Sequence, residues 1–346
     1  MTLTRAAVTL TATLATSLAL TSCAGQSEDE RLHVVAATTQ ICDYVKNLDA
    51  DASLDLTCLL SPNASAHEHE MTNEQMGALN RADVVLVNGV DLERFLDQAI
   101  VSSGFAGTMT VTSGYAGAAP EGRFTVDEGV NKVDIAPWPF EPEPGEEAEF
   151  TFDPHVWTSP RGAAIQVENI ADALDKASGT TEWSERASAY LDQLKDLDQW
   201  VGESLNSVPR EDRVLFTSHD AFGYLARDYD IDFIGSALSD FNAQQDASAA
   251  HIKLGAQQVA DAHAKVIFGE NSNNAKSIEA IARAAGVRAV TGDDALYGDS
   301  LGPEGTDGAT YIGSIVHNVT NLVRAWGGQV APLPASLAGA EPKDVI

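Results

Sequence analysis

Short apolar runs alternate along the chain with longer segments in which apolar residues recur every three or four positions. The runs at 32–39, 53–60 and 83–89 are rich in β-branched and aliphatic residues, which is typical of buried strands. Each is followed by a segment with helical periodicity, namely 40–48, 73–82 and 91–101. A later series predicts strands at 213–218, 231–235, 265–270 and 287–292, with helices ending at 226 and spanning 246–264, 275–286 and 309–327. Strands that alternate with helices build βαβ units. The pattern therefore predicts an α/β fold of two lobes, each with a short, mostly parallel sheet flanked by helices.

One long amphipathic segment, 182–208, separates the two series. Its apolar residues recur on a single face, and as a helix it would be about 40 Å long. We expect it to join an N-terminal lobe, 32–181, to a C-terminal lobe, 209–346.

A helix is also predicted at 161–178. Residues 115–150 break the pattern with five prolines and an acidic run, and they are predicted to form a loop.

The first residues have the features of a targeting segment rather than of a fold. Arg5 precedes an apolar stretch, 6–20, that is shorter than the ~20 residues a membrane-spanning helix needs. Residues 1–22 therefore read as a secretory signal, with a buried N-terminal helix as the alternative. The sequence LTSC at 20–23 is similar to a bacterial lipobox, so Cys23 is the expected lipidation site and 23–31 a flexible tether. We expect an extracytoplasmic protein that meets the membrane only through its lipid.

Composition limits the classes of partner that this protein is expected to bind. The formal net charge is −30, which argues against binding to nucleic acid or to anionic lipid headgroups. A cation fits this sign, although acidic surfaces also serve solubility. Cys42 and Cys58 remain as a pair in an exported chain, where disulfides persist. A Cys42–Cys58 bridge and two buried thiols are the alternatives.

Histidines gather where predicted strands end. His67 and His69 follow the strand at 53–60, His155 follows the long loop, and His219 directly follows the strand at 213–218. Ligands of open α/β sheets bind beyond the carboxyl ends of the strands, so these segments are expected to face one cleft. Imidazole favours zinc among the common metals, and zinc would take a fourth ligand that spacing alone does not identify.

A secreted zinc hydrolase is the alternative function. His67, Glu68 and His69 do not form an H-E-x-x-H motif, which needs two histidines four residues apart on a helix. Side chains two residues apart in an extended segment point to opposite sides. We therefore expect a binding protein and not an enzyme.

Four motifs carry a family resemblance. DPHVWTSP stands at 153–160, PNASAHEHE at 62–70, SHDAFGYLA at 218–226 and YGDSLGPEGTDGATY at 297–311. Over roughly 31–327 the chain resembles the metal-binding (zinc or manganese) substrate-binding proteins of ABC importers, the cluster A-I family. Ser65 and Ala66 depart from the Asp-Pro that the family's first motif carries before its histidine.

The resemblance implies a ligand set of His67, His155, His219 and Asp299, with His69 at an aromatic position of the motif. Supporting contacts are expected from His69, Glu70 and Glu270. It also implies a rigid helix between the lobes, modest opening, a monomer, and delivery of Zn²⁺ to an ABC permease and its ATPase.

Mn²⁺ is the alternative cargo. Many zinc members carry a histidine-rich loop, whereas 115–150 holds no histidine and is acidic instead. Three imidazoles with one carboxylate still favour zinc, because manganese relatives more often have two histidines and two acids. The acidic loop is either a solvated variable segment or a weak collector of cations through Glu141, Glu143, Glu146, Glu147 and Glu149.

Overall fold

The computed structural model describes residues 31–117, 120–138, 151–238, 247–343 and 345–346. The predicted signal segment, Cys23, most of the tether and the acidic run at 141–149 lie outside these residues. Leu32–Ile346 pack together as one unit. In the part of the chain that is described, no helix is both long enough and apolar enough to cross a membrane.

The first sheet has five parallel strands in the order β2-β1-β3-β4-β5. Its strands are β1 (His33–Ala36), β2 (Asp55–Cys58), β3 (Val84–Val87), β4 (Thr108–Val111) and β5 (Thr125–Asp127). The chain pattern missed β4 and placed β5 inside a loop. Two of the three β5 residues are exposed, so no apolar run marks this strand. Backbone pairing of Thr108 with Thr125 extends the edge of the sheet instead.

Helices α1 (Thr39–Leu48), α2 (Asn73–Arg81), α3 (Arg94–Ser103) and α4 (Pro160–Ser178) accompany this sheet. Their starts follow from local chemistry. Thr72 caps α2, since its side chain accepts from the backbone N–H of Gln75 while the Gln75 side chain returns to the Thr72 backbone. Ser159 caps α4, and Pro160 occupies its first position, where no N–H is needed.

The second sheet has four parallel strands in the order β7-β6-β8-β9. Its strands are β6 (Val214–Thr217), β7 (Asp232–Ser236), β8 (Val266–Phe268) and β9 (Arg288–Val290), and its helices are α6 (Gly223–Asp228), α7 (Ala249–Asp261), α8 (Lys276–Ala285) and α9 (Tyr311–Ala325). These elements match the predicted series, although β7 ends one residue and α6 two residues beyond the predicted limits. The α/β fold with two parallel sheets flanked by helices is thus confirmed.

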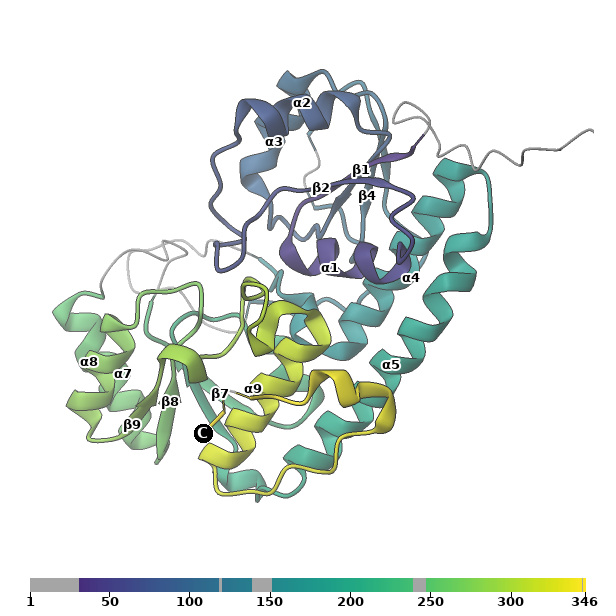
Figure 1. Cartoon of the computed structure of the whole chain (residues 1–346). Helices are drawn as coiled ribbons and strands as arrows, with labels where there is room; N and C mark the ends of the chain where they lie inside the picture. The colour runs from purple at the N-terminus through teal and green to yellow at the C-terminus, as the bar shows by residue number, and fades with distance from the viewer. Residues whose placement is uncertain (1–30, 118–119, 139–150, 239–246, 344) are drawn as a thin grey trace, which may run out of the picture. The chain divides into compact units, whose positions relative to one another are not determined.

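Helix α5 (Glu182–Leu205) stands between the two series and ends three residues before the predicted limit. Glu182 and Glu185 lie in its first turn, where negative charge is favourable. Figure 1 shows α5 in teal beside α4, and it also packs against α1 and α9. Its apolar face is buried through Trp183, Ala187, Tyr190, Leu194, Leu197, Trp200 and Val201.

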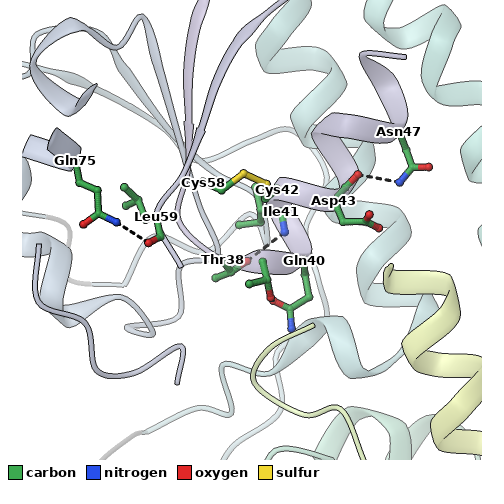
Figure 2. Close-up of a disulfide and its surroundings, with 10 residues drawn as sticks. Thr38, Gln40, Ile41, Cys42, Asp43, Asn47, Cys58, Leu59 and Gln75 are labelled. Atoms are coloured by element: carbon green, nitrogen blue, oxygen red, sulfur yellow. Dashed lines mark hydrogen bonds between the residues drawn. A yellow bond between two sulfur atoms is a disulfide. The ribbon is translucent and has the colours of Figure 1, made fainter. Parts of the chain in front are cut away.

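A disulfide joins Cys42 of α1 to Cys58 at the end of β2 (Figure 2). The two Cα atoms are 5.7 Å apart. Thr38 caps α1 beside it by accepting from the backbone N–H of Ile41 at 3.2 Å. The bridge therefore attaches the start of the loop after β2, which carries His67, to the first helix.

Candidate metal centre

Four side chains from distant parts of the sequence converge at the carboxyl ends of the strands. His67 lies in the loop after β2, His155 just before α4, His219 two residues after β6, and Asp299 between β9 and α9. Each offers one nitrogen or oxygen, and these atoms all lie within 4.8 Å of one another. The structure thus brings together the four residues that the family motifs indicated.

The separations within this group match those of a metal coordination shell. His67 Nε2 lies 3.0 Å from His155 Nε2. Asp299 Oδ1 lies 3.7 Å from His67 Nε2, 3.5 Å from His155 Nε2 and 3.9 Å from His219 Nε2. A tetrahedral zinc ion with bonds of 2.0–2.1 Å would separate its ligand atoms by about 3.3–3.4 Å. These four separations lie within about 0.6 Å of that value, and the full set of donors, which spans up to 4.8 Å, would contract around such an ion.

Asp299 is a buried carboxylate in a position where a nearby positive charge is favourable. It is 1% exposed, and its Oδ1 accepts no hydrogen bond from the described residues. Burial alone would raise the pKa of Asp299, but the imidazoles of His219, His67 and His155 outweigh burial and hold that pKa well below its usual range. An ionised carboxylate in so buried a position is unfavourable unless positive charge lies beside it, which a protonated His155 or a bound cation can supply.

Asp153 orients the His155 ring. Its Oδ1 accepts from the backbone N–H of His155 at 2.9 Å and lies 2.7 Å from Nδ1 of the same residue. With the Nδ1 proton facing this carboxylate, Nε2 is the nitrogen that faces His67 and Asp299 and would ligate a metal once it is deprotonated. A carboxylate behind the ring of a ligating histidine is the common arrangement at metal sites. Sequence reasoning missed Asp153, although the Asp-Pro-His spacing already places the carboxylate two residues before the imidazole.

The three histidines differ in charge state. Burial lowers the pKa of His219 to about 3 and also lowers the pKa of His67. Burial acts the same way on His155, but Asp153 and Asp299 outweigh it and raise its pKa to about 10. Two imidazoles are therefore neutral and ready to ligate, whereas metal binding must displace a proton from the third.

His69 takes a different direction from His67. Its Nε2 lies 3.0 Å from Gln75 Oε1 on α2, and its ring packs edge-on against Phe95 of α3 with centroids 5.4 Å apart. Glu70 is exposed. The structure thus places His69 among α2 and α3 and Glu70 in solvent, rather than against the four converging residues.

Glu270 lies behind His219, two residues past the end of β8. It is 4% exposed, and its Oε1 accepts from the backbone N–H of His219 at 2.8 Å. Burial and the nearby Asp299 charge raise its pKa well above the usual range.

Gln40 and Trp157, which both precede α5 in the sequence, hydrogen-bond to the backbone of the segment that carries Asp299. Sequence reasoning missed both. Gln40 Nε2 donates to the Asp299 carbonyl at 3.1 Å, and Figure 2 shows its amide directed at this loop. Trp157 Nε1 donates to the Gly298 carbonyl at 2.9 Å. Their partners lie more than 140 residues away in the sequence, so no local signal could have found them.

Comparison with known proteins agrees with this geometry. A family model described as "Zinc-uptake complex component A periplasmic" (ZnuA) matches residues 34–325. The zinc-binding protein TroA of Treponema pallidum is 31% identical over 296 residues, covering 84% of this chain and 88% of that protein. The manganese-binding lipoprotein MntA of Bacillus subtilis is 28% identical over 324 residues, covering 91% of this chain and 98% of that protein.

The solved structure of the periplasmic zinc binding protein TroA from Treponema pallidum is also similar. It matches with a TM-score of 0.69 at 28% identity, covering 86% of this chain and 99% of that one. The family model spans nearly all of the described chain, and the four converging donors lie inside it. The chain therefore belongs to the zinc-uptake complex component A family of metal-binding substrate-binding proteins of ABC importers.

Proposed function

We propose that this chain is an extracytoplasmic lipoprotein that binds Zn²⁺ and delivers it to an ABC permease and its ATPase. The observation that carries the proposal is the convergence of His67, His155, His219 and Asp299, whose donor atoms lie within 4.8 Å of one another. The metal is the cargo of this site. Ligands from segments on both sides of α5 would hold it until the permease receives it.

Zinc rather than manganese is favoured by the donor set. Three imidazole nitrogens and one carboxylate suit Zn²⁺ in tetrahedral geometry, whereas Mn²⁺ prefers oxygen ligands and higher coordination numbers. Relatives are named for zinc and for manganese, so their names do not separate the two metals.

A carrier rather than a hydrolase is favoured by the number of donors. Catalytic zinc keeps one coordination position open for water, with three protein ligands. Here a fourth side chain, Asp299, is already in place. The lipoprotein part of the proposal is supported by the LTSC sequence at 20–23 and by relatives that are named lipoproteins.

The decisive experiment is calorimetric titration of the purified, metal-free chain with Zn²⁺ and, separately, with Mn²⁺. We expect one Zn²⁺ per chain, bound more tightly than Mn²⁺, and a loss of at least about 100-fold in Zn²⁺ affinity for His155→Ala or His219→Ala. His251→Ala, an imidazole of α7, is the matched control and should bind like the wild type. Tighter binding of Mn²⁺ would contradict the zinc assignment, and unchanged affinity in the two ligand variants would contradict the site.

A further inference from the structure

The Glu270 carboxylate spans the backbones that carry two of the four converging residues. On one side its Oε1 accepts from the His219 N–H at 2.8 Å. On the other side Oε2 faces Gly298, where an added Cβ would lie only 2.2 Å from that oxygen. The three atoms nearest to such a Cβ all belong to Glu270. The absence of a side chain at residue 298 is therefore what leaves room for this carboxylate, directly beside Asp299.

Glu270 itself is fixed by the sheet. It forms a parallel bridge with Leu296, and the backbone N–H of Asn271 donates to the Leu296 carbonyl at 2.9 Å. The segment leading to Asp299 is thereby paired with the continuation of β8. The carboxylate projects from this pairing to His219, which lies at the end of the neighbouring strand β6.

The His219 backbone is held from two directions. Its N–H donates to Glu270, and its carbonyl accepts from the hydroxyl of Thr217. Both partners are buried, at 4% and 0% exposure. Glu270 does not belong to the group of side chains whose donor atoms lie within 4.8 Å of one another. Its contacts therefore indicate support of a ligand rather than ligation.

We propose that Glu270 is a positioning residue for the metal site, setting the separation of His219 and Asp299, and that Gly298 is required to admit its carboxylate. This inference rests on the proposed metal-binding function. It gives Glu270 a role other than metal ligation. The buried Glu270 carboxylate would fix the positions of His219 and Asp299, the two ligands that follow α5, relative to each other.

The first test compares Glu270→Ala with Glu270→Gln. Residues that orient metal ligands typically change metal affinity by 10–100-fold, so we expect Glu270→Ala to weaken Zn²⁺ binding by about that factor. Glutamine keeps an acceptor oxygen for the His219 N–H and should remain within about threefold of the wild type. Affinity is measured by competition with a chromophoric chelator. Glu68→Gln, which removes an exposed acid next to His67, controls for the loss of negative charge.

A spectroscopic readout separates positioning from general stability. The visible absorption spectrum of bound Co²⁺ reports coordination geometry, and we expect it to change in Glu270→Ala but not in Glu270→Gln or Glu68→Gln. A glutamine variant as weak as the alanine variant would overturn the inference, because charge rather than position would then be responsible. An unchanged Co²⁺ spectrum and affinity in Glu270→Ala would overturn it as well.

A second test uses Gly298→Ala in two backgrounds. The added methyl group must displace the Glu270 carboxylate and, through it, the His219 N–H, so we expect a loss of about tenfold in Zn²⁺ affinity. In the Glu270→Ala background the same substitution meets no carboxylate and should cost less than about twofold. Equal losses of Zn²⁺ affinity in both backgrounds would show that the Glu270 carboxylate does not occupy the space beside Gly298. Failure of the wild type to bind Zn²⁺ or Co²⁺ would instead contradict the proposed function, which keeps the two failures distinguishable.

Discussion

The direction of single side chains decides which of two neighbouring histidines reaches the metal centre. His67 and His69 are two residues apart, and an extended backbone sends such side chains to opposite sides. The His67 side chain is 4% exposed and joins His155 and Asp299. His69 instead contacts Gln75. The His67 imidazole belongs to the metal centre, whereas the His69 imidazole packs with the neighbouring helices α2 and α3.

This division gives a prediction at the residue scale. Replacing His67 with alanine should lower Zn²⁺ affinity by at least about 100-fold, since a direct ligand is lost, whereas His69→Ala should change it by less than about tenfold. Zinc titration of the two purified variants measures both values. Equal losses would mean that both rings ligate and that the one-ligand assignment is wrong.

At the scale of an element, the turn between β3 and α3 depends on a buried acid. The Glu93 carboxylate accepts from the backbone N–H groups of Asn88 at 2.6 Å and Gly89 at 3.2 Å. The turn is strained, because Val90 and Asp91 adopt φ values of 56° and 57°. Burial raises the pKa of Glu93 from 4.5 to about 7, despite these two donors.

The raised pKa predicts how stability depends on pH. Below pH 4.5 the Glu93 carboxyl is protonated in both states, and between pH 4.5 and 7 the unfolded chain loses the proton first. The free energy of unfolding should therefore fall as pH rises through this window, with about 2–3 kcal/mol lost between pH 5 and 8 from this group. Urea unfolding at both pH values measures the loss, and Glu93→Gln should reduce it by that amount.

Asp43 and Asp220 have raised pKa values of about 6 and about 7, so they titrate in the same window. Only the difference between wild type and Glu93→Gln is therefore diagnostic. An identical pH dependence in the two proteins would show that the Glu93 carboxyl titrates normally in the folded chain.

At the scale of the whole molecule, the site joins residues from both sides of α5. His67 and His155 precede this helix, and His219 and Asp299 follow it. Protein contacts already connect the same segments. The Tyr224 hydroxyl of α6 donates to the Asp153 carbonyl at 2.8 Å. This hydrogen bond ties the segment before His155 to a helix that follows α5, and the modest opening that the family resemblance implies stays a prediction.

A metal shared in this way should stabilise the entire fold. Zn²⁺ at 100 times its dissociation constant should raise the free energy of unfolding by about 2.7 kcal/mol, because it binds the folded chain and not the unfolded one. Thermal unfolding followed by tryptophan fluorescence should show a single transition at higher temperature. His219→Ala should abolish the shift under the same conditions. Two separate transitions, with only one shifted by zinc, would show that one lobe alone holds the ion.

The sequence by itself determined the α/β class and the order of most helices and strands, and its resemblance to a family indicated the four residues that converge. Local periodicity encodes which face of an element is buried, and the motif around 153–160 places His155 among its neighbours. The short edge strand β5 was not predicted because two of its three residues are exposed, and it is held by backbone pairing with β4. No apolar pattern records such pairing.

Only the tertiary structure decided the geometry of the site. The 3.0 Å approach of His67 to His155 joins residues 88 positions apart, and the contact of Glu270 with His219 joins residues 51 positions apart. The space that Gly298 leaves for Glu270 depends on how two chain segments pack, and not on the composition of either one. Coordination distances, charge states and supporting contacts arise from burial and long-range packing, and these exist only once the chain has folded.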